Sequence, residues 1–148
     1  MEIKFKKLTP DLMVADVTAA VRFYTEKLGF KLNMLVPENE KLIETKLADG
    51  KRYVYAMVSR NDTFVMFMRK DAYGEDIPAL KGVPVGASAA FYYDVDNVDE
   101  IYDTFKEKRV DIIKDISTTW YGMKEFYIRD CNGYILGFAE KMLQSQEL

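Results

Sequence analysis

The chain has 148 residues, 49% of them hydrophobic and 30% charged, which suits one globular domain with a buried core and excludes a mainly disordered chain. The net charge is only −3 and the basic residues are scattered, so we expect no nucleic-acid partner. The chain has no histidine, which excludes an ordinary histidine-ligated metal enzyme.

Two further features bear on the compartment. Cys131 is the only cysteine, so an intrachain disulfide is excluded and a reducing compartment is favoured. The opening sequence MEIKFKKLTP has no apolar signal core, and no apolar run approaches the roughly 20 residues of a membrane span. We therefore expect a cytoplasmic, soluble protein without a membrane partner.

The first half begins with a predicted strand through Leu12 and Val14. Asp16 is a predicted N-cap, because a carboxylate accepts hydrogen bonds from the free N–H groups of a first helical turn. The following helix carries an apolar stripe and ends at Gly29. Three strands are predicted after it, over residues 30–36, 52–60 and 63–69.

The second half repeats this order 81 residues later, since the segment that begins at Ala90 matches the one that begins at Thr9. Asn97 is the predicted N-cap of its helix, with Glu100 completing a capping box. Strands are then predicted over residues 111–116, 123–129 and 134–139. Turn residues at 48–50, 60–62 and 131–133 indicate hairpins.

The chain is thus predicted to be an α+β protein in which a βαβββ unit occurs twice. We place module 1 at about residues 5–70, a glycine- and proline-containing linker at about 71–86, and module 2 at about 87–141. The two modules together form one domain that spans the whole chain.

Two motifs carry a family resemblance: VADVTAAVRFYTEKLGF in the first half and YGMKEFYIRDCNGYILGFAE in the second. With the duplicated unit, they resemble the vicinal oxygen chelate superfamily of glyoxalases, dioxygenases and bleomycin-resistance proteins. The resemblance implies curled mixed sheets around a cavity, with the helices on the convex side. The second motif is most similar to the bleomycin-resistance type, which binds its drug without the metal site of the enzymes.

The enzymes of this superfamily hold a divalent metal with four side chains, commonly His, Gln or Glu. Carried over residue by residue, these positions fall here on Thr9, Met66, Ala90 and Gly137. A hydroxyl, a thioether, a methyl group and a hydrogen do not replace imidazole or carboxylate ligands. We therefore expect no metal and no other cofactor.

Alternation along the strands assigns neighbours of these vacant positions to the cavity side. This rule selects Asp11, Met66, Met68, Tyr92 and Asp94. The family resemblance implies that Glu125 and Tyr127 also face the cavity, and Trp120, in the loop before their strand, completes the predicted ligand-binding residues. Carboxylates among aromatic faces attract cations, so we expect an aromatic or cationic organic ligand.

Each of these assignments has a structural alternative. The tyrosines also suit a core or an interface, Trp120 suits a dimer interface, the acidic residues suit a solvated rim, and the methionines suit gaps in a core. No residue is predicted to be catalytic.

The sequence therefore predicts a metal-independent protein that sequesters a small organic molecule, with drug resistance as one role, and that forms a homodimer. One alternative is a glyoxalase- or dioxygenase-like enzyme with a metal-free active site, in which the base would be Glu125, Asp11 or Asp94 with a raised pKa, or a tyrosine with a lowered pKa. Another is a structural or regulatory module without a ligand.

Overall fold

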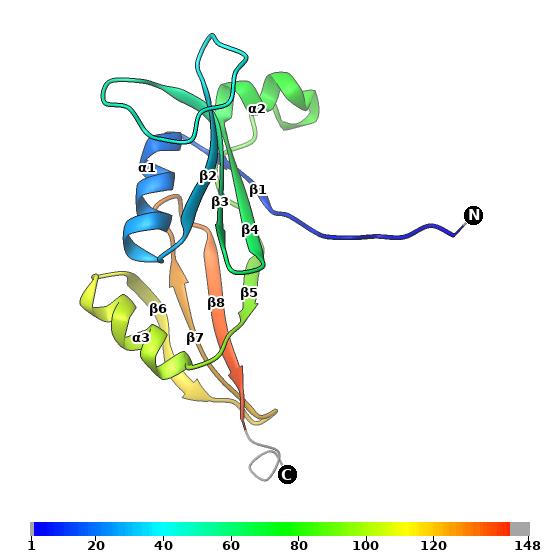
Figure 1. The fold of residues 1–148 in the computed structure, drawn as a ribbon. Coiled ribbons are helices and arrows are strands. Elements are labelled where there is room, and N and C mark those ends of the chain that lie inside the picture. The colour runs from blue at the N-terminus through cyan, green and yellow to red at the C-terminus, as the bar shows by residue number, and fades with distance from the viewer. Residues whose placement is uncertain (1, 143–148) are drawn as a thin grey trace. The chain divides into compact units, whose positions relative to one another are not determined.

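A computed structural model describes residues 2–142 and divides the chain into two units, residues 1–85 and 86–148 (Figure 1). Each unit holds a four-stranded mixed sheet, in the order β1-β4-β3-β2 in unit 1 and β5-β8-β7-β6 in unit 2. The first strand of each unit pairs in parallel with the last, and the other pairs are antiparallel. The predicted α+β fold with two βαβββ units is confirmed.

The elements of unit 1 are β1 (Asp11–Val14), α1 (Val17–Arg22), a π-helical turn η1 (Phe23–Lys27), β2 (Lys31–Pro37), β3 (Tyr53–Arg60), β4 (Thr63–Arg69), α2 (Lys70–Asp76) and a 3-10 turn η2 (Pro78–Leu80). Those of unit 2 are β5 (Ala90–Asp94), α3 (Val98–Glu107), β6 (Asp111–Thr118), β7 (Met123–Arg129) and β8 (Ile135–Lys141). The region 71–86, predicted as a linker, thus contains most of α2 and all of η2.

One face of each sheet packs against a helix through aromatic side chains. In unit 1 the fully buried Tyr24 lies edge-on to Phe67 of β4, with ring centroids 4.9 Å apart. In unit 2 Phe105 of α3 lies edge-on to Phe138 of β8 at 5.3 Å, and Phe138 stacks on Phe126 of β7. Because strand side chains alternate, the residues between these aromatics face the other way, onto what we call the open face of each sheet.

The two main helices begin differently. The Asp16 side chain accepts a hydrogen bond from the Ala19 N–H at 3.1 Å, as predicted. The capping box at Asn97 is wrong: Asn97 adopts a left-handed conformation with φ 58° and its side chain makes no capping bond. The Val98 N–H donates instead to Glu140 Oε1 at 3.0 Å. A residue distant in sequence, on β8, therefore replaces the local cap.

Candidate functional site

The open face of unit 2 is organised in two rows of residues that cross three adjacent strands. Tyr92 on β5 lies opposite Gly137 on β8, and Gly137 lies opposite Tyr127 on β7. In the next row Ala139 lies between Asp94 on β5 and Glu125 on β7. The structure thus brings four predicted site residues onto one surface: Tyr92, Asp94, Glu125 and Tyr127.

Glu125 is the centre of this surface. Its side chain is buried, with 2% of the residue exposed, and Oε1 accepts a hydrogen bond of 2.5 Å from the Tyr92 hydroxyl. The Tyr121 hydroxyl lies 3.4 Å from both carboxylate oxygens. No lysine or arginine of the described chain forms an ion pair with Glu125. Among residues 2–142, the carboxylate is therefore held by tyrosine hydroxyls and has no ion-pair partner.

The ring of Tyr127 fills the space beside Gly137. A Cβ atom at position 137 would lie 2.6 Å from Tyr127 Cε2, which no side chain tolerates unless the ring moves. The Tyr127 and Tyr92 rings face each other at a tilt, with centroids 6.3 Å apart. Lys114 Nζ lies 5.6 Å from the Tyr127 centroid, so this ring already interacts with a cation.

Burial and Glu125 both raise the pKa values of the surrounding tyrosines. Burial of its hydroxyl raises the pKa of Tyr92 far above its ordinary value, and the hydrogen bond to Glu125 raises it further. The pKa of Tyr127 is raised by burial and then by the charge of Glu125. These hydroxyls therefore stay protonated at neutral pH, and the Tyr92 hydroxyl donates a hydrogen bond to Glu125.

Trp120 and Tyr121 lie at the border of this surface, in the turn between β6 and β7. Trp120 is 91% exposed and contacts the Tyr121 ring edge-on, with centroids 5.3 Å apart. Tyr121 itself contacts Glu125 and was not among the predicted site residues. Tyr121 precedes the strand β7, so the alternation rule did not reach it, although its position next to Trp120 in the sequence was a usable signal.

The open face of unit 1 carries methionines where unit 2 carries tyrosines. Asp11 on β1 lies opposite Met66 on β4, and Met68 lies between Met13 and Tyr55. Asp11 Oδ1 is buried and accepts no hydrogen bond in the described structure. Burial and the charge of Asp76 raise the pKa of Asp11, and the Tyr73 hydroxyl lowers it in part. The predicted residues Asp11, Met66 and Met68 are thus also neighbours.

The registers of the two units agree with the offset of 81 residues found in the sequence, which relates Asp11 to Tyr92. Asp11 opposite Met66 in unit 1 matches Tyr92 opposite Gly137 in unit 2, so Met66 is the counterpart of Gly137. Within the described residues, no group of three or more His, Cys, Asp or Glu side chains is arranged to hold a metal. The side chains of Thr9, Met66, Ala90 and Gly137 do not fit a divalent ion, because none provides a carboxylate, imidazole or thiolate donor.

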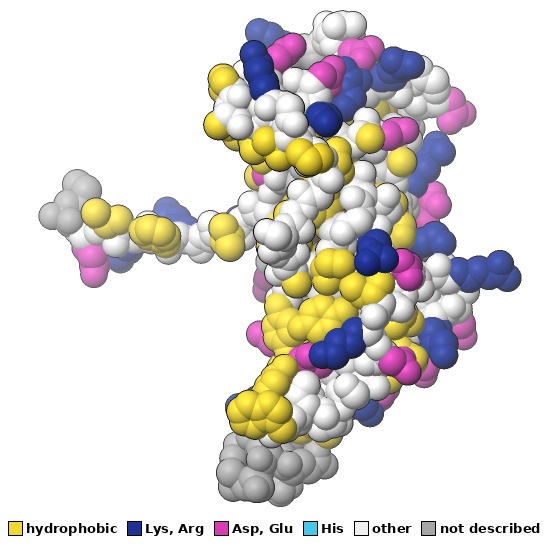
Figure 2. All heavy atoms as spheres, turned by 180° about the vertical axis from the view of Figure 1, so that it is seen from behind, with side chains coloured by type: hydrophobic (Ala, Val, Ile, Leu, Met, Phe, Trp, Pro, Cys, Tyr) yellow, Lys and Arg dark blue, Asp and Glu magenta, His cyan; other side chains and the backbone are white. Residues whose placement is uncertain are grey.

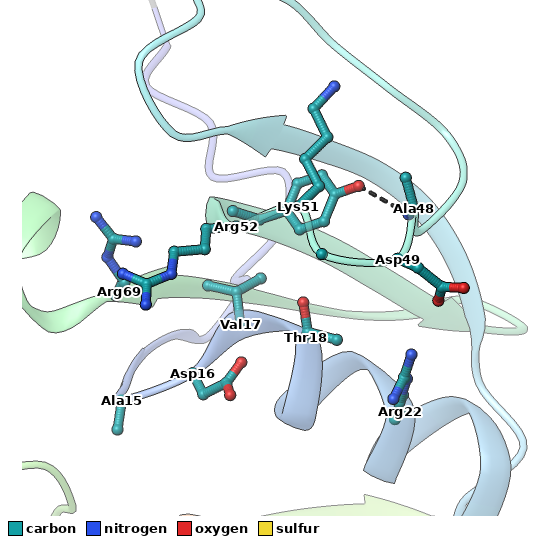
Figure 3. Close-up of a pocket in the computed structure, with 12 residues that line it drawn as sticks. Ala15, Asp16, Val17, Thr18, Arg22, Ala48, Asp49, Lys51, Arg52 and Arg69 are labelled. Carbon is teal, nitrogen blue, oxygen red and sulfur yellow. Dashed lines mark hydrogen bonds between the residues drawn. The ribbon is translucent and has the colours of Figure 1, made fainter.

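A separate cavity of about 680 Å³ lies in unit 1 between the start of α1 and the loop before β3 (Figure 3). Its wall includes Asp16, Thr18, Lys51 and Arg69, and no predicted site residue. Lys51 is paired with Glu44, and Arg69 is paired with Glu38 and Asp71. Because the wall is mainly polar and two of its basic side chains are already paired, we do not place the ligand site here.

No helix in the described part of the chain is long and apolar enough to cross a membrane. No curated protein matches the sequence.

Solved structures share this fold. One is TioX from Micromonospora sp. ML1, at 19% identity and a TM-score of 0.66, covering 93% of this chain and 100% of TioX. A glyoxalase/bleomycin resistance protein/dioxygenase from Nocardioides has 15% identity and a TM-score of 0.71, covering 97% and 88%. A family enzyme from Burkholderia phytofirmans PsJN has 16% identity and a TM-score of 0.68, covering 90% and 97%.

The family comparison covers most of the sequence. Residues 6–138 match the family model of the Glyoxalase/Bleomycin resistance protein/Dioxygenase superfamily. This agrees with the resemblance drawn from the duplicated unit and its two motifs. The chain therefore belongs to the glyoxalase/bleomycin resistance protein/dioxygenase superfamily.

Proposed function

We propose that this protein binds a small organic cation on the open face of unit 2 and sequesters it without a metal. One observation carries the proposal: Glu125 is 2% exposed, yet no positive side chain of the described chain forms an ion pair with it. A buried carboxylate is costly unless it is paired and hydrogen-bonded. Tyrosine hydroxyls meet the second condition, and a ligand cation would meet the first.

The surroundings of Glu125 favour an organic cation over a metal ion. Tyr92 and Tyr127 present ring faces, which attract ammonium or guanidinium groups by cation–π interaction. Lys114 above Tyr127 is an intramolecular example of this contact. A flat or aromatic body on the ligand would also stack on exposed Trp120 beside Tyr121.

Asp94 adds a second carboxylate on the same face. It is exposed and lies in the same row as Glu125, separated from it by Ala139. Its role would be to attract the cation from solvent, whereas Glu125 pairs with it after desolvation. Capture of a cationic drug is one biological use of such a site, and membership of a superfamily that includes bleomycin resistance proteins supports it.

The test is a titration of Trp120 fluorescence with a panel of planar cationic compounds, bleomycin-like compounds included. Trp120 is the only tryptophan, so the signal comes from the border of the site. Glu125→Gln should weaken binding at least about tenfold, which corresponds to ~1.4 kcal/mol. Asp111→Asn is the matched control, because Asp111 is an exposed acid that pairs with Arg129 on β7.

No binding across the panel would refute the proposal. Turnover of a hemithioacetal after treatment with a chelator would instead support the metal-free enzyme, because sequestration predicts that bound compounds are recovered unchanged.

A further inference from the structure

The open face of unit 1 carries methionines in a row across adjacent strands. Met34 on β2 lies opposite Met57 on β3, and Met57 lies opposite Met66 on β4. Directly opposed side chains project from the same face of a sheet, with Cβ atoms roughly 4.5–5.5 Å apart. These methionines are partly exposed, whereas Ala56 and Phe67, which alternate with them along the strands, are fully buried. We call Met34, Met57 and Met66 the methionine row.

The side chains of the methionine row are able to meet one bound species. Methionine is unbranched and has three rotatable bonds, so neighbouring sulfur atoms can converge without a change of the backbone. The row is also accessible, because its side chains are partly exposed. Hydrophobic side chains, the colour class that includes methionine, reach the surface between charged groups in Figure 2. The row therefore offers several thioether sulfurs to a ligand from solvent.

A carboxylate lies at the end of the methionine row. Asp11 on β1 is opposite Met66, and its Oδ1 atom is buried and accepts no hydrogen bond within the described residues. No ion pair within residues 2–142 involves Asp11 or Asp76, the acid whose charge acts on Asp11. A buried carboxylate without a partner is costly, so this end of the row favours a bound positive charge.

The ammonium group of Lys7 lies on the same face but is not that partner. Lys7 Nζ is 3.9 Å from the ring centroid of Phe64, which precedes Met66 by two residues on β4 and so points the same way. Lys7 forms no ion pair with Asp11 in the described part of the chain. The face thus accepts a cation on an aromatic ring, while the thioethers and the carboxylate remain for another one.

The donor atoms indicate which kind of cation fits. Thioether sulfur is a soft, neutral ligand that favours Cu(I), whereas Zn²⁺ and Mg²⁺ favour imidazole, thiolate or carboxylate ligands. A monovalent ion needs a single negative charge for balance, which the Asp11 carboxylate supplies. An organic cation would be held better by aromatic ring faces, as in unit 2, than by thioethers.

We propose that the methionine row binds a soft monovalent metal ion, Cu(I), and that Asp11 balances its charge. All four residues belong to unit 1, so this site is separate from the proposed ligand site of unit 2. It also differs from the divalent metal site that the family resemblance implies. Sulfur atoms from β2, β3 and β4 take the place of imidazole and carboxylate ligands, and only Met66 belongs to both sets.

The first test follows isotope-labelled methionine methyl groups by NMR during titration with Ag(I), a soft monovalent ion that is stable in air. The background is Cys131→Ser, because the exposed Cys131 thiol would itself bind Ag(I) or Cu(I). Equimolar Ag(I) should shift the methyl signals of the methionine row. The signal of Met123, on β7 of unit 2, should stay in place.

The second test measures the affinity for Cu(I) without oxygen, by competition with a coloured Cu(I) chelator in the same background. Met57→Leu/Met66→Leu should raise the dissociation constant at least tenfold, because leucine keeps the volume of methionine and removes its sulfur. Met123→Leu is the matched control and should leave the constant unchanged. Asp11→Asn should weaken binding less than the double variant, because it removes the balancing charge and no sulfur. Circular dichroism should show that all variants are folded.

Three results would overturn the proposal: equimolar Ag(I) leaves the signals of the row in place, the double variant binds Cu(I) like the control, or Zn²⁺ shifts the same signals as far as Ag(I) does. A shift with tetramethylammonium but not with Ag(I) would assign the face to organic cations and overturn it as well. The NMR titration changes no residue of the row, so it decides the question even if the double variant is unfolded. Ligand binding by unit 2 is followed through Trp120, so neither proposal depends on the other.

Discussion

At the scale of residues, the site of unit 2 depends on Gly137, because the absence of a side chain there leaves room for the Tyr127 ring. Gly137 lies between Tyr92 and Tyr127 on the open face, and the Tyr127 ring occupies the place of a Cβ atom at position 137. The family resemblance predicts that this position corresponds to a metal-ligand position of the enzymes. Here the glycine leaves room for the Tyr127 ring, so this position supports an aromatic side chain on the open face.

Gly137→Ala should therefore disturb the site while the protein stays folded. The added methyl group must push the Tyr127 ring aside, and such overpacking costs about 1–3 kcal/mol in a well-packed position. We expect a value at the lower end, because the ring belongs to a movable side chain. Thermal denaturation and ligand titration would show a lower Tm and weaker binding.

The control is a double-mutant cycle with Tyr127→Ala. In that background Gly137→Ala should cost little, because the ring it displaces is absent. Equal costs of Gly137→Ala in both backgrounds would contradict the assigned packing.

Asp11 gives a prediction of pH dependence. Its raised pKa means that the folded state binds this proton more tightly than the unfolded state. The protonated Asp11 therefore stabilises the folded state fully at pH values below its pKa in the unfolded chain. This stabilisation is lost as the pH rises through its higher pKa in the folded protein. Asp11→Asn should thus raise Tm by a few degrees at pH 7, and the gain should shrink toward acid pH.

Asp71 is a control of opposite sign, because the hydrogen bond from Arg69 lowers its pKa. Asp71 stabilises the folded state at pH values above its pKa in the unfolded chain. This stabilisation is lost as the pH falls through its lower pKa in the folded protein. Asp71→Asn should slightly lower Tm at pH 7, with no difference in acid. If both variants shift Tm in the same direction at pH 7, the account of Asp11 fails.

Among single residues, the face of the sheet on which a strand side chain lies was predictable, whereas the direction of a turn side chain was not. Alternation from the predicted metal positions placed Tyr92 on the open face, and the family pattern placed Glu125 and Tyr127 there. The structure has all three on one face, because a strand has only two faces. Tyr121 lies in a turn, where no such period exists. The isolation of Glu125 from cations also could not be read from the sequence, since it depends on which lysines and arginines the fold places nearby.

At the scale of elements, α3 is joined to its sheet by its own N-terminal cap. Glu140 accepts from the Val98 N–H, and Glu140 belongs to β8, the strand that also carries Gly137 and Ala139. This bond links the first turn of the helix to one end of that strand. The Asn97 side chain makes no capping bond. Its backbone adopts the left-handed conformation, with a φ of 58°, at the start of the helix.

Glu140→Ala should consequently destabilise unit 2 by about 1 kcal/mol, the usual cost of losing a helix cap. Denaturant unfolding would measure it. Asn97→Gly should be neutral or stabilising, because glycine adopts the left-handed conformation without strain. If Asn97→Gly lowered the free energy of unfolding more than Glu140→Ala, the result would support the capping box that the sequence predicted.

The strand boundaries followed from sequence because pattern and turns agreed locally. β4 and β7 occupy the residues predicted for them, and Asn61 and Gly133 have positive φ in the expected hairpins. The cap of α3 was missed because Glu140 lies 42 residues from Val98 in sequence. A contact in α2 was missed for the same reason. The Tyr73 hydroxyl donates a hydrogen bond of 2.7 Å to the Asp11 backbone oxygen, and these two residues lie 62 positions apart in the sequence.

At the scale of the whole molecule, the βαβββ unit occurs twice, and the two copies carry different side chains on their open faces. The matched positions hold Met66 and Gly137, and beside them stand Asp11 in unit 1 and Tyr92 in unit 2. In unit 1 the carboxyl group of Asp11 lies opposite Met66 and is influenced by the Tyr73 hydroxyl, whereas in unit 2 the carboxyl group of Glu125 accepts a hydrogen bond from Tyr92. The two units therefore share their register and differ in the side chains on their open faces.

The most direct test of this account is a calorimetric comparison of two ligands of the same shape, one carrying an ammonium group and the other a neutral isostere. The unaltered protein should prefer the cation by at least about tenfold, or ~1.4 kcal/mol. Glu125→Gln should remove that preference with little change in the affinity for the neutral compound. Equal preference for the cation in both proteins would contradict the assignment of Glu125 as the group that recognises positive charge.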